Sequence, residues 1–134
     1  MARIDWVKQR LENWALWKER ESRGGMGFYS MSSFLRVAVD RSHHDALLST
    51  VDDIEAQETD KAVSSLLASH QQVHRTIVLI YLEDTGIRKA AMLLGRAEST
   101  VKANLEKGDH LMAAWLRERA AEKERRQSAG SFTS

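Results

Sequence analysis

Apolar residues recur every three or four positions along most of the chain, and this spacing predicts α-helices. The first predicted helix covers residues 4–23, and its inner face consists of Ile4, Val7, Leu11 and Trp14. A second predicted helix covers residues 51–69 and is capped by Asp52 or Asp53. Its expected inner face consists of Ile54, Ala62, Val63, Leu66 and Leu67.

The most apolar part of the chain is residues 70–82, which ends in Ile77-Val-Leu-Ile-Tyr-Leu. A run without polar interruptions fits either a buried strand or a helix, and its length and flanks favour a central helix. We expect Gly86 to end this helix in a left-handed conformation. Gly24 and Gly25 are expected to make a tight turn after the first helix, and a short helix is predicted at residues 30–39.

Residues 87–105 read as two short helices joined by a turn. Ala90, Ala91 and Leu94 share one helical face, Gly95 ends that helix, and a second helix opens near Glu98. Val101 and Leu105 then point inward. This spacing is typical of a helix-turn-helix, and an ordinary helical hairpin is the alternative.

The last helix is expected to continue well beyond residue 105. Its inner face goes on through Leu111, Met112, Trp115 and Leu116, with Gly108 as a local weak point of about 1 kcal/mol relative to alanine. Residues 127–134 are small and polar and should fray.

The sequence therefore predicts an all-α fold, a helical bundle with a helix-turn-helix and an N-terminal helical extension. Three segments are expected: 1–50, amphipathic and aromatic with a glycine-rich loop; 51–118, the helix-turn-helix domain; and 119–134, a charged helix end and flexible tail.

Composition narrows the functional classes. The 134 residues contain no cysteine, so disulfides and thiolate metal sites are excluded, which fits a cytoplasmic protein. No apolar run approaches the roughly 18 residues of a membrane span, and the amphipathic N-terminus is not a secretory signal, so no membrane partner is expected. The formal net charge is +1, so any affinity for nucleic acid must come from local placement of charge.

That placement is uneven. Residues 1–36 are mostly basic, whereas residues 40–60 hold seven carboxylates against Arg41 alone. The asymmetry fits a protein with two different partners, or simply a solvated acidic loop and helix start.

If the helix-turn-helix is real, the start of its second helix enters the major groove. The side chains expected to face DNA there are Ser99, Thr100, Lys102, Ala103 and Asn104. Asn104 could bond to adenine and Lys102 to guanine. Arg96, together with Arg88 and Lys89 on the supporting helix, is placed for phosphates. Two features depart from this pattern. Arg96 lies in the turn where sigma-like proteins, which this segment resembles, usually carry an aliphatic residue, and Ala97 lies where serine commonly caps the helix. Glu98 suits the helix dipole but repels phosphate.

Histidines offer the remaining candidate metal ligands. His43 and His44 are adjacent and point in different directions, which makes a poor chelate. His70 and His74 are spaced to share a metal on one helix face, but a solvated or hydrogen-bonded pair fits as well. Because the chain lacks a nucleophile with a base, a metal set or paired carboxylates in a credible context, we expect no enzyme and no cofactor.

Two tryptophans, Trp6 and Trp17, lie eleven residues apart on another part of the first helix. They fit either core packing or an anchor for a partner protein, since tryptophan is enriched at interface hot spots.

Several stretches resemble known families. The run GRAESTVKANL is similar to the last two helices of sigma factor region 4 and of related response-regulator DNA-binding domains, with Gly95, Thr100, Val101, Lys102 and Leu105 in register. LENWALW, RGGMGFYS and SFLR resemble the opening of the phage antitermination Q-like proteins, and residues 59–116 resemble their sigma-region-4-like body.

The resemblance implies a late-gene antitermination factor of a bacteriophage, acting in the bacterial host cell. Such proteins bind a DNA element near the late promoter, load onto sigma-containing RNA polymerase and suppress termination. The implied partners are double-stranded DNA, bacterial RNA polymerase, sigma factor and a second copy of the chain. Trp6, Trp17 and Arg20 would be the polymerase contact. A DNA-binding repressor, activator or sigma-like factor without antitermination activity, and a pure protein-interaction role, are the alternatives.

Overall fold

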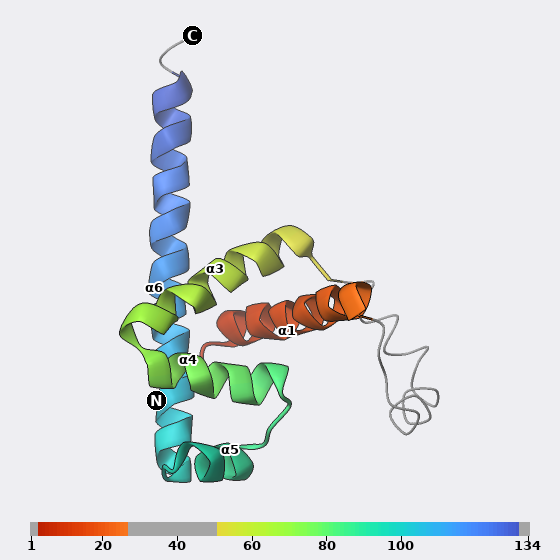
Figure 1. The fold of residues 1–134 in the computed structure, drawn as a ribbon. Coiled ribbons are helices and arrows are strands. Elements are labelled where there is room, and N and C mark those ends of the chain that lie inside the picture. The colour runs from red at the N-terminus through yellow and green to blue at the C-terminus, as the bar shows by residue number, and fades with distance from the viewer. Residues whose placement is uncertain (1–2, 27–50, 132–134) are drawn as a thin grey trace.

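The fold of the described residues is entirely helical, in agreement with the predicted all-α class. The structure is a computed structural model that describes residues 3–26 and 51–131. Its elements are α1 (Asp5–Met26), α3 (Asp53–Ser69), α4 (Gln71–Ile77), the π-helical turn η1 (Val78–Leu82), α5 (Ile87–Leu94) and α6 (Glu98–Ser131). Helix α6 is the long axis of the molecule; α1, α3 and α4 pack beside its middle, and α5 lies across its first turns (Figure 1).

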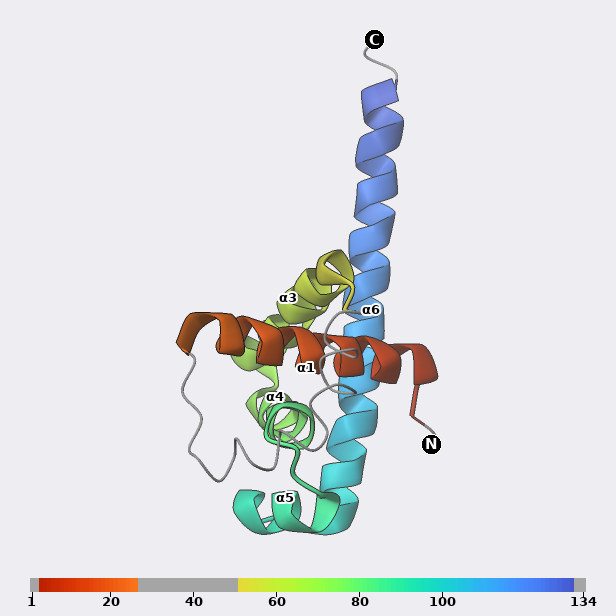
Figure 2. The same ribbon diagram turned by 90° about the vertical axis from the view of Figure 1, so that its right-hand side faces the viewer.

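One main core joins the first helix to the rest of the chain. It contains Val7, Leu11 and Trp14 of α1, side chains of α3 and α4, and Met112, Ala113 and Leu116 of α6. The inner face predicted for the first helix is therefore confirmed. Helix α1 crosses α6 (Figure 2), and the division predicted at residue 50 does not separate two cores.

The start of α3 is capped as predicted, but part of its predicted inner face is wrong. The Asp52 carboxylate accepts a hydrogen bond from the Glu55 amide at 3.0 Å. Ile54 and Leu67 are 76% and 52% exposed. The face that is buried consists of Ala56, Thr59, Ala62, Val63 and Leu66. Ile54 lies outside this buried face. Thr59 is buried although it is polar and was not part of the predicted apolar face, and its hydroxyl donates a hydrogen bond to the Glu55 carbonyl at 2.8 Å.

The apolar run after His70 is helical, as predicted, but its end widens into a π-turn. The Glu83 amide donates to the Val78 carbonyl, five residues earlier, at 3.1 Å. Ile77 and Tyr81 face the main core, whereas Leu79 belongs to a second cluster beside α5.

The turn that follows corrects the expectation for Gly86. Asp84, not Gly86, has the left-handed backbone, with φ 50°. Gly86 is extended, at φ −69° and ψ 165°, because it is the residue before α5, and its carbonyl accepts from the Ala90 amide at 2.9 Å. Aspartate tolerates the left-handed region better than most side chains.

Helices α1 and α6 both extend further than the sequence predicted. Helix α1 continues through Gly24 and Gly25 to Met26, so these glycines lie in its last turn. Helix α6 is continuous to Ser131, past most of the segment expected to fray, and its C-terminal part extends beyond the other helices (Figure 1). The helix predicted at 30–39 and the pair His43 and His44 lie outside the described residues.

Gly108 is a packing residue. A Cβ atom added there would lie 3.0 Å from Ile77 Cδ1 and 3.2 Å from Val73 Cγ1, both on α4. Glycine lowers the helix stability at this position, but it also allows α4 and α6 to approach closely. A larger side chain would prevent that approach.

We expect Gly108→Leu to lower the free energy of unfolding by about 2 kcal/mol, because overpacking outweighs the better helix propensity of leucine. Urea unfolding followed by circular dichroism measures the change. Ala114→Leu, an exposed position on the same helix, is the matched control and should be nearly neutral. Equal stability of the two variants would contradict the close approach.

A buried carboxylate ties the start of α1 to α6. Asp109 is 1% exposed, and its Oδ2 accepts from Arg3 Nε at 2.6 Å and from the Ile4 amide at 2.9 Å, while Oδ1 accepts from Arg3 Nη2 at 3.0 Å. Arg3 Nη2 also donates to the Tyr81 hydroxyl at 2.8 Å. Burial raises the pKa of Tyr81, and the hydrogen bond from Arg3 opposes that rise in part.

Candidate nucleic-acid interface

Two helices and a three-residue turn form the predicted DNA-binding segment. Gly95 ends α5 in the left-handed conformation, at φ 65° and ψ 37°, as predicted. The Arg96 amide donates to the Ala91 carbonyl at 3.0 Å, which closes the end of α5. Helix α6 opens at Glu98, and the Ala97 carbonyl accepts from the Val101 amide at 3.2 Å. Alanine has no side-chain acceptor, so this helix start has no side-chain cap at Ala97.

A small core fixes the two helices against each other. It contains Leu79, Ala90, Ala91 and Val101, of which Ala90 and Val101 are fully buried. Partly buried Ile80, Ile87 and Leu94 pack around it. The alanines allow α5 to lie close to α6, and the predicted inner positions of this segment are confirmed.

Most of the predicted DNA contacts lie on the solvent side of these helices. The exposed members are Arg88, Lys89, Arg96, Ser99, Lys102 and Ala103, and Thr100 is partly exposed. Positions 99 and 103 are one helical turn apart and continue to Lys107, which is also exposed. The sequence interpretation missed Lys107, although this four-residue spacing could have identified it.

Asn104 does not belong to this exposed face. Its side-chain amide donates to Thr76 Oγ1 at 3.2 Å and faces Gln72 Oε1 at 3.5 Å, so it is directed toward α4 and partly buried. The predicted contact of Asn104 with adenine is therefore corrected. The cause is the position of residue 104 between the inner and outer faces of α6, from which its side-chain amide donates a hydrogen bond to the buried Thr76 and not to solvent.

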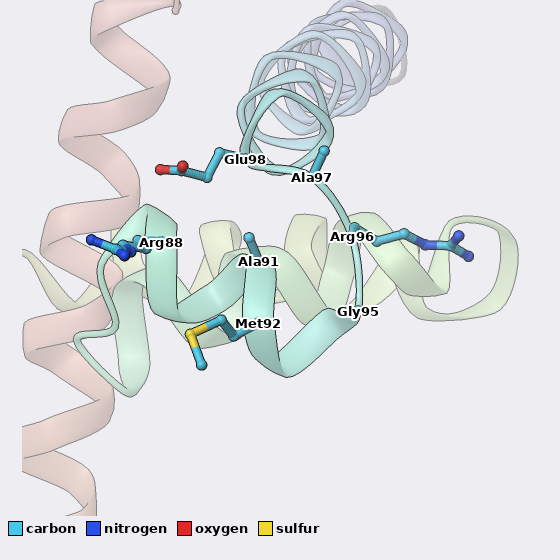
Figure 3. A pocket seen from close by; sticks show the side chains of 7 residues that line it. All are labelled: Arg88, Ala91, Met92, Gly95, Arg96, Ala97 and Glu98. Atoms are coloured by element: carbon cyan, nitrogen blue, oxygen red, sulfur yellow. The ribbon is translucent and has the colours of Figure 1, made fainter.

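A shallow hollow lies between α5 and the start of α6 (Figure 3). Arg88 and Glu98 extend to the same side of it, whereas Arg96 extends to the opposite side. Met92, which lines the hollow, is 77% exposed. The lining of the hollow thus combines cationic, apolar and acidic side chains.

The charges of this end differ from those of the rest of the chain. Residues 87–107 contain five cations, Arg88, Lys89, Arg96, Lys102 and Lys107, against the two carboxylates Glu98 and Glu106, a balance of +3. None of these seven groups forms an ion pair with any residue that the structure describes.

The basic N-terminal helix and the acidic start of α3 instead neutralise each other. Lys18 Nζ lies 3.2 Å from Asp60 Oδ1, and Arg20 pairs with Asp53. Arg10 lies 3.9 Å from both Glu55 and Glu58. The part of the predicted charge asymmetry that falls on these described residues therefore reflects an internal α1–α3 contact.

The three predicted polymerase contacts are in different environments. Trp6 is 38% exposed, with the Arg117 guanidinium 5.6 Å from its ring centroid. Trp17 is partly buried and packs against the main core, and Arg20 is engaged with Asp53. Of the three, Trp6 is the most exposed side chain.

Other binding chemistry receives no support from the described residues. No group of three or more metal-ligating side chains lies together in them, and the His70 ring is hydrogen-bonded to the Ser69 hydroxyl at 2.8 Å. Within the same part of the chain no helix is long and apolar enough to cross a membrane.

Comparison of the chain with family models, curated proteins and solved structures gave no match, so the functional assignment depends on the residues and geometry described above.

Proposed function

We propose that this chain is a late-gene transcription antitermination factor that binds double-stranded DNA through a helix-turn-helix formed by α5 and α6, and then engages RNA polymerase. The observation that carries the DNA-binding part is the set of five exposed cations on α5, the turn and the first part of α6, none of which forms an ion pair with a described residue. In α1, by contrast, Arg10, Lys18 and Arg20 pair with carboxylates of α3, whereas the cations of the α5–α6 segment remain available for phosphates.

The arrangement fits reading of the major groove. The first turns of α6 expose Ser99, Lys102 and Ala103 on one side, while Val101 and Leu105 hold the helix to the body. In helix-turn-helix proteins the N-terminal residues of the second helix contact base edges, and the preceding helix contacts the backbone. Arg88 and Lys89 occupy that supporting position here.

The DNA-binding part is tested by titrating the protein with a labelled duplex at several salt concentrations. Five phosphate contacts predict that log K falls with log salt with a slope of about −4.5. Tight binding with a slope near zero, or no binding to any duplex, would remove this part of the proposal and favour a role in protein interaction alone.

The antitermination part is supported by the resemblance to Q-like proteins in the sequence and by the exposed indole of Trp6, which offers a protein contact far along the chain from the DNA-binding segment. A DNA-binding regulator without antitermination activity is the alternative, and it needs no such contact.

We expect Trp6→Ala to reduce terminator readthrough at least tenfold while leaving DNA affinity unchanged, because Trp6 does not belong to the main core. Trp17→Ala is unsuitable, since Trp17 packs against the main core and its loss would destabilise the fold. Full readthrough by folded Trp6→Ala protein would exclude Trp6 as the polymerase contact.

A further inference from the structure

Glu98 is the unusual residue of the proposed interface. It is the first residue of α6, is exposed, and shares the hollow with Arg88 without forming an ion pair (Figure 3). A carboxylate in this position repels the phosphates that the neighbouring cations attract. It therefore weakens non-specific binding at the very surface proposed to approach DNA.

We propose that Glu98 is a specificity-determining residue whose carboxylate accepts a hydrogen bond from the exocyclic amine of a cytosine in the major groove. This inference rests on the proposed DNA-binding function and names one base that the interface reads.

The chemistry follows from what a carboxylate can do. An ionised carboxylate only accepts hydrogen bonds. In the major groove, cytosine presents the N4 amine as a donor, whereas guanine presents two acceptors and thymine one, and both would be repelled. Adenine presents a donor next to an acceptor, so it fits less well than cytosine.

Position distinguishes Glu98 from the other carboxylate of the segment. Glu106 lies two turns further along α6 and is only partly exposed, whereas Glu98 precedes Ser99 and Lys102 on the first turn. The first turn is the part of a recognition helix that reaches base edges. A purely structural role, interaction with the helix dipole, would affect stability and leave base preference unchanged.

The test is selection of bound duplexes from a random-sequence pool by the wild-type chain and by Glu98→Ala, Glu98→Gln and Glu106→Ala. We expect the wild type to select cytosine at one position about tenfold over guanine or thymine. Glu98→Ala should lose that preference alone and bind random DNA several-fold more tightly. Glu98→Gln should shift the preference toward adenine, because glutamine pairs with adenine N6 and N7. Glu106→Ala should keep the wild-type preference.

Two results would overturn the inference while leaving the proposed function in place: a wild-type protein that binds DNA without base preference, and a Glu98→Ala variant that gains affinity uniformly with its base preference intact. A wild-type protein that binds no duplex would contradict the proposed function itself. Thermal unfolding of each variant shows whether the compared proteins are folded.

Discussion

Replacing Asp109 with alanine is expected to lower the free energy of unfolding by about 3 kcal/mol. The side chain is 1% exposed and accepts three hydrogen bonds, two from Arg3 and one from the Ile4 amide. Its removal leaves a partly buried guanidinium and a backbone amide without their partner, which costs more than the intact pair contributes. Urea unfolding at neutral pH measures the difference.

A double variant separates this explanation from simple loss of volume. Arg3→Met combined with Asp109→Leu removes both charges and keeps apolar bulk, so it should be clearly more stable than Asp109→Ala. A loss below about 1 kcal/mol for Asp109→Ala would mean that this contact does little to hold α1 on the body.

Removing four cations of the α5–α6 segment is expected to weaken binding to random-sequence DNA about a hundredfold or more at low salt. The variant carries alanine at Arg88, Lys89, Arg96 and Lys102, none of which has an ion-pair partner among the described residues. Each lost phosphate contact should also reduce the magnitude of the salt slope by about one.

The matched control removes the same amount of charge elsewhere. Alanine at Lys61, Lys123, Arg125 and Arg126 changes exposed side chains on α3 and on the projecting part of α6. It gives the same net charge and should bind almost as tightly as the wild type. Equal loss in both variants would show that net charge, and not the α5–α6 segment, governs binding.

The sequence predicted the α5–α6 segment well because the determinants there are local. The determinants lie close together in the chain: the left-handed Gly95, the alanines of α5, and Val101, which follows the glycine by six residues. Such features depend on backbone conformation and helical spacing, which a single sequence contains.

Two predictions failed, one because of packing against a distant helix and one because of the local turn before α5. Ile54 is apolar but exposed, because the side of α3 that packs with α1 in the main core carries Ala62, Val63 and Leu66 instead. Gly86 was expected to be left-handed, but that conformation is adopted by Asp84, since Gly86 is needed in extended form before α5. Neither outcome follows from propensity alone.

The burial of Asp109, by contrast, could have been predicted from the helical periodicity of the sequence. Asp109 lies four residues after Leu105 and three before Met112, on the inner face of α6, so the pattern places a carboxylate in the core. Its partner, Arg3, is 106 positions away in the chain and could not be chosen from sequence.

The α1–α3 ion pairs change the electrostatic interpretation of the whole chain. A net charge of +1 argues weakly for nucleic acid. Arg10, Lys18 and Arg20 of α1 are matched with carboxylates of α3, whereas the segment 87–107 keeps a local excess of +3. Local excess of this kind is what a protein of nearly neutral total charge needs for binding DNA.

The most direct test of the account is terminator readthrough in a purified system with bacterial RNA polymerase, sigma factor, a phage late-promoter template with its pause site, and this protein. We predict readthrough that requires the upstream DNA element and is lost when Thr100 and Lys102 are both replaced by alanine. Unchanged termination, with salt-dependent DNA binding retained, would contradict antitermination and leave a DNA-binding transcription regulator.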